Sequence, residues 1–287
     1  MATFTEIVEL LMTPSAPVIF FGLVVIIGAP IILHLILSSS ATYTVPPVVL
    51  LLGPENAGKT ALATLLERGT KPAQTHTSQV TQSVELNAST DSDAKQSFRN
   101  HDDATGTYTK FLLVDTPGHG KLRNVAMARL GRSTEKLKAV VFMVDAAALV
   151  EQDTLASTAA YLYDVLLHLQ KRAGDKSRAR TAVSVLIAAN KLDLFTALPA
   201  AMVKSHLENE LTRIRTSKSK GLLDSGVAMD DIGSEEQDAW LGEYGSDKFS
   251  FGQMPEFDID VEVLGGSVMA EDADVDKWWW WIAQRAS

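Results

Sequence analysis

The sequence contains no cysteine, and its basic residues are outnumbered by its acidic ones. The lack of cysteine excludes a disulfide framework, a thiol nucleophile and cysteine-ligated zinc. The 26 basic and 35 acidic residues give a formal net charge of −9. Because binding to nucleic acid requires a basic face that neutralises phosphates, direct nucleic-acid binding is not expected.

Charged residues are absent from residues 18–37, and the first lysine or arginine of the chain is Lys59. Twenty consecutive uncharged, mostly apolar positions match the roughly 20 residues that a helix needs to cross a bilayer. We therefore predict a transmembrane helix at 18–37. A cleaved signal peptide is the alternative, but it requires a basic start, whereas residues 1–16 contain glutamate and no basic residue.

The rest of the chain is predicted to form one globular domain. The expected organisation is a short tail at 1–17, the transmembrane helix at 18–37, a linker at 38–45 and the domain at 46–287. Within the domain, residues at about 216–252 are polar and acidic and show no clear period. We interpret this long polar segment as an insertion.

The domain begins with a pattern that binds phosphates. Residues 53–60 (GPENAGKT) fit G-x-x-x-x-G-K-[ST] between a predicted buried strand at 46–52 and a predicted amphipathic helix. The glycines let backbone N–H groups face the phosphates, the lysine supplies positive charge, and the threonine hydroxyl is a ligand for Mg²⁺. A glycine-rich turn with a chance Lys-Thr is the alternative, but the flanking strand and helix argue against it. The predicted nucleotide contacts of this loop are Gly53, Glu55, Asn56, Ala57, Gly58, Lys59, Thr60 and Ala61.

A second motif follows the strand predicted at 110–114. Asp115 and Gly118 form D-x-x-G at the carboxyl end of this strand, the edge at which open α/β sheets bind ligands. Asp115 is expected to hold Mg²⁺ through water, and the Gly118 N–H is expected to contact the γ-phosphate. A chance turn is the alternative, but the position after a strand and after the phosphate loop favours the functional interpretation.

A third motif, Asn190-Lys191-Leu192-Asp193, follows the strand predicted at 182–189. The Asp193 carboxylate can accept two hydrogen bonds from guanine N1–H and its amino group, which adenine cannot supply. Lys191 is expected to pack along the base, and Asn190 to tie this loop to the phosphate loop. A surface turn is the alternative. The motif predicts selectivity for guanine nucleotides.

Further strands are predicted at 80–86, 139–144 and 259–264, and helices at 152–173, 198–215 and 272–285. The stretch at 87–107 is predicted to be a solvated loop.

The last helix contains Trp278 to Trp281. Because four successive residues sweep most of a helix circumference, the indoles cannot all face one core. One interpretation is that two of the indoles are buried and two lie at the rim of the core. The other is that some of the indoles contact a membrane interface or a partner.

The order of these motifs resembles that of the Ras-like small GTPases over about residues 48–285. Within that group, the apolar N-terminus, Thr77-Ser78, D-T-P-G-H, the following Leu-Arg and the F-x-F segment at 249–255 resemble the signal recognition particle receptor β subunits. These are relatives of the Arf and Sar GTPases. The resemblance implies an α/β, Ras-like P-loop GTPase fold, with a mostly parallel six-stranded sheet, helices on both faces, and one transmembrane helix before it.

The resemblance also implies further site residues. Thr77 is expected to bind nucleotide and to join Thr60 and Asp115 at Mg²⁺. His119 is expected to orient the attacking water as the catalytic residue. No arginine is fixed as a finger in cis, so GTP hydrolysis is expected to be slow without a partner.

The base-side loop after the last strand departs from the usual pattern of this group. The usual S-A-K is here Ser267-Val268-Met269. Ser267 is still expected at the base, and Val268 is expected to offer its N–H to guanine O6.

By this resemblance the chain binds GTP and Mg²⁺, and its GTP form binds the N-terminal domain of the receptor α subunit through the switch regions. It would hold that subunit at the endoplasmic reticulum membrane for co-translational protein targeting, with the translocon or ribosome as further candidate partners. The expected topology is single-pass with a cytosolic GTPase domain. Charge gives little guidance on orientation, because Lys59 lies beyond the ~15–20 residues over which it acts.

Three other functions compete with this hypothesis. An Arf/Sar-type vesicle-trafficking GTPase would have a lipidated or amphipathic N-terminus instead of a full span. A P-loop kinase or ATPase would not require the guanine motif at 190–193. A binding module in which hydrolysis is incidental overlaps with the favoured hypothesis.

Overall fold

The computed structural model describes residues 16–40, 46–69, 74–89, 108–132, 136–174, 182–224, 240–243 and 246–286. The chain divides into two compact units, Met1–Val45 and Pro46–Ser287. Each unit is described by itself.

The first unit contains helix α2 (Ala16–Ser40), which includes the stretch predicted to span a membrane. It has no acidic residue in its first turn and no basic residue in its last, and Pro30 lies inside it. Many of its large apolar side chains are exposed, among them Phe20 and Ile26. Within the part of the chain that the structure describes, no helix is found that is long and apolar enough to cross a membrane. The transmembrane span therefore stays a prediction.

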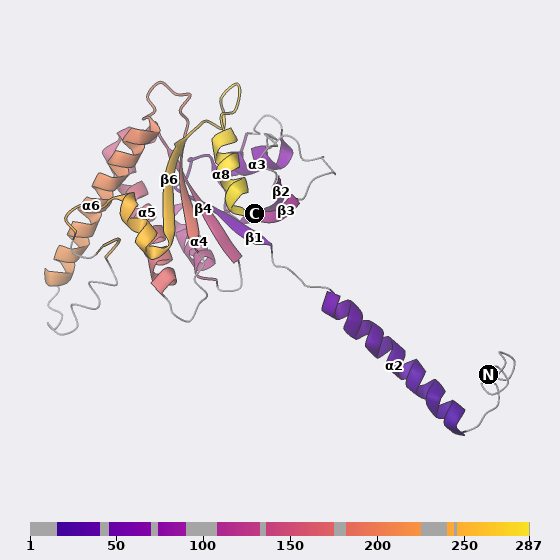
Figure 1. Ribbon diagram of the computed structural model, residues 1–287. Coiled ribbons are helices and arrows are strands. Elements are labelled where there is room, and N and C mark those ends of the chain that lie inside the picture. Colours follow the sequence, from indigo (N-terminus) through magenta and orange to yellow (C-terminus); the bar gives the residue numbers. More distant parts are fainter. Residues whose placement is uncertain are drawn as a thin grey trace. The chain divides into compact units, whose positions relative to one another are not determined.

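The second unit is organised around a six-stranded sheet in the order β2-β3-β1-β4-β5-β6 (Figure 1). The strands are β1 (Pro47–Leu52), β2 (Gln82–Ser89), β3 (Tyr108–Asp115), β4 (Lys136–Asp145), β5 (Val183–Asn190) and β6 (Ile259–Gly265). Among the six strands that the structure describes, only the edge strand β2 pairs antiparallel, with β3. The inner strands β1, β4 and β5 are nearly continuous apolar runs, because both faces of a parallel sheet are covered. The mostly parallel six-stranded sheet is confirmed.

Helices cover both faces of this sheet, as predicted (Figure 1). They are α3 (Lys59–Arg68), α4 (Arg123–Leu130), α5 (Gln152–Gly174), α6 (Ala200–Asp224) and α8 (Asp276–Ala286), with short 3-10 turns η1 (Gly120–Leu122), η2 (Ala148–Val150) and η3 (Phe251–Phe257). Val48, Leu50 and Leu52 of β1 face the core under α4, α5 and α6. Val49 and Leu51 face the core under α3 and α8, because successive side chains of a strand alternate.

Several predicted boundaries are wrong. Strand β2 begins at Gln82 instead of 80 and continues through Ser89, so the first part of the predicted loop at 87–107 is strand. Asn87 there pairs with Lys110. Residues 90–107 lie outside the described part of the chain.

Helix α6 is longer than predicted, because it continues past Arg215 to Asp224. The start of the predicted insertion is therefore helical. The far end of the insertion packs on the domain, since the buried Arg215 guanidinium lies 4.5 Å above the Trp240 ring and donates to Leu241 O. Residues 225–239 and 244–245 are outside the described residues.

The tryptophan run of α8 is mainly a core element. Trp278, Trp279 and Trp281 are buried, and only Trp280 is half-buried. The Trp278 Nε1–H donates to Leu264 O at 3.2 Å, which satisfies its polar atom inside the core. The sequence-based division into two buried and two rim indoles is therefore corrected to three and one. The three buried indoles do not provide a membrane or partner surface.

This packing makes α8 the subject of a stability prediction. Trp278→Ala removes a fully buried side chain, so the free energy of unfolding should fall by about 3–5 kcal/mol. Trp280→Ala, the matched control at the half-buried position between Trp279 and Trp281, should change it by well under half of that. Urea unfolding of the full chain, followed by circular dichroism, measures both. Equal losses for the two variants would contradict this packing of the run.

Candidate functional site

A cavity of about 610 Å³ lies where β1, β4 and β5 end. In parallel sheets the carboxyl ends of the strands meet at one edge, so loops far apart in sequence converge there. The predicted site residues that line the cavity are Glu55, Asn56, Gly58, Lys59, Thr60, Ala61, Thr77, Gly118, Asn190 and Lys191. All three sequence motifs therefore contribute to one site.

The phosphate loop between β1 and α3 has a backbone that requires its two glycines. Gly53 has φ 133° and Gly58 has φ 96°, both in the region that glycine favours. A Cβ on Gly53 would lie 2.2 Å from Met143 O, and one on Gly58 would lie 2.3 Å from Asn190 Nδ2. Helix α3 begins immediately after this loop, and its N-terminal N–H groups favour an anion.

Lys59 is the cation of the loop and is only 5% exposed. Its Nζ donates to Gly53 O at 3.0 Å and to Pro54 O at 2.6 Å. Burial lowers the pKa of Lys59 to about 8, although the nearby Asp115 and Glu55 carboxylates raise it in part. An anion placed beside this ammonium group would favour its charged form.

Thr60 and Asp115 form a pair of oxygen ligands beside Lys59. The Thr60 hydroxyl donates to Asp115 Oδ2 at 2.6 Å, and Asp115 is 1% exposed. Burial raises the pKa of Asp115, against the opposing effects of Thr60 and Lys59. Its other oxygen, Oδ1, has no hydrogen-bond partner among the described residues.

These oxygens fit Mg²⁺. This ion is usually held by one or two protein oxygens together with water and substrate phosphates, so a hydroxyl and one buried carboxylate suffice. Among the described residues no group of three or more His, Asp or Glu side chains could hold a metal. Thr77, the third predicted ligand, lies in the irregular segment before β2 and lines the same cavity.

Asn190 joins the base-side loops to the phosphate loop. Its Nδ2 donates to Ala57 O at 2.8 Å, and its Oδ1 accepts the N–H of Val268 at 3.1 Å. The tie between the third motif and the phosphate loop is as expected. The predicted contact of the Val268 N–H with guanine O6 is not available in this arrangement, because Asn190 occupies that donor.

The other base-side residues lie outside the cavity wall. The Ser267 hydroxyl donates to Asp193 Oδ1, and neither residue lines the cavity. The side chain that does line it from this loop is Met269, which the sequence analysis placed only as a departure from S-A-K.

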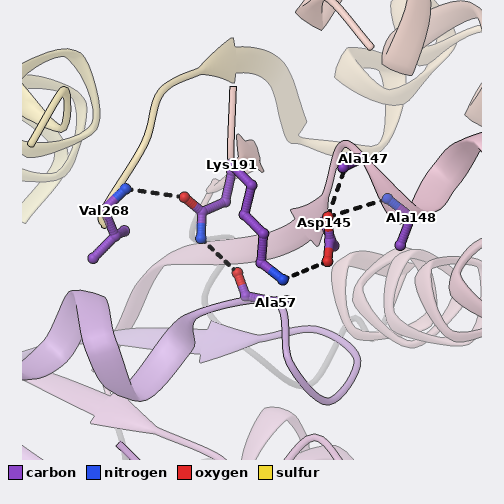
Figure 2. A network of polar contacts seen from close by, with 7 residues as sticks. Ala57, Asp145, Ala147, Ala148, Lys191 and Val268 are labelled. Carbon is purple, nitrogen blue, oxygen red and sulfur yellow. Dashed lines mark hydrogen bonds and ion pairs between the residues drawn. The ribbon is translucent and has the colours of Figure 1, made fainter. Parts of the chain in front are cut away.

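Asp145 is a cavity residue that the sequence analysis did not assign. It forms an ion pair of 2.6 Å with Lys191, and its Oδ1 accepts the N–H groups of Ala147 and Ala148 at 3.1 Å each (Figure 2). This pair orients Lys191, whose φ of 66° is unusual for a lysine. Its position at the end of β4, beside Asn190 of β5, is the signal that could have found it.

His119 does not face the cavity. Its side chain is exposed, and its Nδ1 accepts the N–H of Lys121 at 3.3 Å at the start of η1. A water-orienting role would therefore require the ring to rotate. Gly118 beside it approaches the phosphate loop so closely that a Cβ there would lie 2.4 Å from Lys59 Nζ.

Comparisons with known proteins find a matching family and similar chains. The family model "Signal recognition particle receptor beta subunit" matches residues 44–257. Signal recognition particle receptor subunit beta of Saccharomyces cerevisiae is 29% identical over 241 residues, which cover 83% of this chain and 84% of the yeast protein. The Mus musculus protein of the same name is 34% identical over 61% of this chain and 58% of its own length.

Solved structures of this kind are also similar. The SRb-GTP/SRX complex of the signal recognition particle receptor from Chaetomium thermophilum has a chain that is 44% identical, with a TM-score of 0.71. The match covers 83% of this chain and 100% of that one. The SRb-GDP-Mg structure from the same organism is 43% identical, with a TM-score of 0.61, and covers 85% of this chain and 100% of that chain.

The Asn190 tie predicts a specific loss of stability. Asn190→Ala leaves the buried Ala57 carbonyl and Val268 N–H without a partner, which should lower the free energy of unfolding by about 2–4 kcal/mol. Lys191→Ala, which breaks a partly exposed ion pair next to it, should cost no more than about 1 kcal/mol. Urea unfolding without added ligand compares the two. A loss of the same size for both would mean that Asn190 does not fasten these loops.

Proposed function

This chain belongs to the family of signal recognition particle receptor β subunits, and we propose that it is the GTP-binding, membrane-anchored subunit of that receptor. In its GTP form it would bind the N-terminal domain of the receptor α subunit and hold it at the endoplasmic reticulum membrane. The observation that carries this proposal is the convergence of Lys59, the Thr60–Asp115 pair and the Asn190 tie on one cavity. Related solved chains with GTP and SRX, and with GDP and Mg, support it.

The residues have defined roles in this proposal. Lys59 and the N–H groups of the phosphate loop bind the β- and γ-phosphates, and Thr60, Asp115 and Thr77 hold Mg²⁺, which neutralises charge on those phosphates. Asp193, oriented by the Ser267 hydroxyl, accepts hydrogen bonds from the guanine ring. The Lys191 stem lies along the base while its ammonium pairs with Asp145.

The docking face for the α subunit would be built from the two segments next to the γ-phosphate. Exposed apolar side chains support this, because Val80 follows the Thr77 segment and is 72% exposed, and Val125 lies on α4 and is 43% exposed. Ordering of both segments by GTP is a switch of the kind found in other GTPases. The outward position of His119 fits slow hydrolysis in the absence of a partner, which keeps the GTP form populated.

Helix α2 would be the single membrane span, with the GTPase domain in the cytosol where nucleotide is abundant. Its exposed apolar side chains and the absence of charge at either end support this assignment.

The membership in the receptor family argues against an independent Arf/Sar-type trafficking GTPase. The translocon and the ribosome stay candidate partners that only the sequence resemblance suggests.

The base assignment predicts a change of nucleotide preference. Asp193→Asn should weaken GTP binding at least tenfold, a change of about 1.4 kcal/mol, and favour xanthine nucleotides, because an amide donor suits the xanthine carbonyl. Asp153→Asn, at an exposed aspartate on α5, is the control and should leave both affinities unchanged. Titration with GTP and xanthosine triphosphate measures this. A GTP affinity within about twofold of the parent chain would remove Asp193 from the base site.

The experiment that tests the function is calorimetric titration of the receptor α-subunit N-terminal domain into the GTP- and GDP-loaded chain. The GTP form should bind at least ~10-fold tighter, a coupling of ~1.4 kcal/mol. Val125→Ser should abolish most of this binding, whereas Val150→Ser, at a valine that is 61% exposed on η2 outside the docking face, should not.

Two outcomes of this titration would count against the proposal. Equal affinities of the two nucleotide forms would make the chain a constitutive anchor instead of a switch. The absence of binding in both forms would refute the receptor function itself.

A further inference from the structure

A second cavity, of about 320 Å³, lies next to the first and plays no part in the function proposed above. It shares Glu55, Asn56, Gly118 and Asp145 with the nucleotide cavity. The remaining wall comes from Pro54, from the segment after Gly118, from Ala148 of η2 and from the start of α5. The phosphate loop therefore borders both cavities.

Two donors in this second cavity have no acceptor among the residues that the structure describes. Thr158 is 1% exposed, and its Oγ1 has no hydrogen-bond partner in the described part of the chain. The buried Nε of Arg123 likewise lacks one among the described residues. The Arg123 guanidinium is held 4.6 Å from the centre of the Tyr161 ring, so a cation–π contact fixes its position. Buried donors of this kind are usually paired, and a cation and a hydroxyl together favour a carboxylate.

Two carboxylates border both cavities, and Asp145 already forms an ion pair with Lys191; the other is Glu55. It is one of the charges that raise the pKa of Lys59, so it lies within electrostatic reach of the ammonium group that would bind a phosphate. A γ-phosphate at that ammonium would lie close to a second negative charge, and like charges a few ångströms apart repel each other. The Glu55 side chain is exposed and therefore has room to move.

We propose that, when a nucleoside triphosphate occupies the first cavity, the Glu55 carboxylate turns into the second cavity and pairs with Arg123 and Thr158. The inference rests on the GTP binding proposed above. Glu55 is then a specificity residue that distinguishes the triphosphate from the diphosphate. With the diphosphate there is no γ-phosphate to displace it, and it stays within electrostatic reach of Lys59.

The pair also links the nucleotide to the docking face. Arg123 is the first residue of α4, directly after η1, and Val125 of the docking face is two positions further on. Gly118, at the start of the same segment, is so close to the phosphate loop that a Cβ there would lie 2.7 Å from Glu55 N. A Glu55–Arg123 pair formed only with the triphosphate would therefore hold this segment against the loop in that state alone.

A double-mutant cycle tests this inference on the full chain with Mg²⁺ present. Dissociation constants for GTP and GDP are measured for the parent chain, Arg123→Gln, Glu55→Gln and the double variant. Arg123→Gln should raise the ratio of the GTP to the GDP constant roughly tenfold, because Glu55 is left facing the γ-phosphate. In the Glu55→Gln background the same change should alter the ratio by less than about twofold. Thr158→Val should act in the same direction as Arg123→Gln, but less strongly.

Controls separate the pair from other effects of losing a cation. Lys121→Gln removes a positive charge from an exposed position nearby that lines neither cavity, and it should leave the ratio unchanged. Circular dichroism midpoints of all variants are compared so that a folding defect is recognised.

Three results of these measurements would overturn the inference. If Arg123→Gln raises the ratio equally with Gln at position 55, Arg123 acts on the phosphate itself and the pair is refuted. If both nucleotides lose affinity equally, Arg123 is only structural and the inference is again wrong. If the parent chain binds no guanine nucleotide, the proposed function fails, and this inference fails with it.

Discussion

The site depends on one buried amide. Asn190 ends β5, and its side chain holds the Ala57 carbonyl of the phosphate loop and the Val268 N–H of the loop after β6. A parallel sheet brings the carboxyl ends of its strands to one edge, but it does not fix the loops that follow them. An amide has a donor and an acceptor on one rigid group, so it can hold two loops at once. The spacing between the phosphate side and the base side of the cavity follows from this residue.

The same edge of the sheet is electrostatically incomplete. Lys59 is buried and has a lowered pKa, and Asp115 is buried with one oxygen unpaired in the described residues. The opposite charges of Lys59 and Asp115 offset the effect of burial on each other's pKa only in part. Such groups reduce the stability of the empty domain, because desolvation disfavours their charged forms. A polyphosphate with a divalent cation supplies both missing charges. The free energy of unfolding is therefore lower for the empty domain and rises when the ligand binds, so ligand occupancy is coupled to folding.

The inner sheet and the motifs could be predicted because their physical signals are local. Strands β1, β4 and β5 are apolar runs since both faces are covered, and β1 and β5 lead directly into the phosphate loop and the guanine motif. The edge strand β2 was misplaced because an edge strand in which buried and exposed residues alternate can begin and end at several residues with similar plausibility. Helix α6 was cut short because its last residues, such as Ser217 and Lys218, are polar and exposed. Polar residues on one side of a helix and polar residues of a loop look alike in sequence.

Contacts between loops were the least accessible to sequence reasoning. The pairing of Lys191 with Asp145 joins residues 46 positions apart, and only the register of β4 against β5 brings them together. The Val268 N–H was assigned to the base because the motif places it there, and only the structure shows that Asn190 accepts it. A motif specifies residue types at fixed positions. It does not specify which of two acceptors a backbone donor will choose.

The open positions of a motif are where two proteins with the same loop can differ. In G-x-x-x-x-G-K-[ST] the glycines, lysine and threonine are required by backbone conformation, phosphate charge and metal ligation. Position 55 is unconstrained by any of these, yet its side chain borders both the nucleotide cavity and the cavity lined by Arg123. A carboxylate there is unfavourable for a polyphosphate unless a second site takes it up. Two buried donors in a cavity that Glu55 also lines have no acceptor among the described residues, and this is the reason to treat Glu55 as part of the machinery and not as a tolerated substitution.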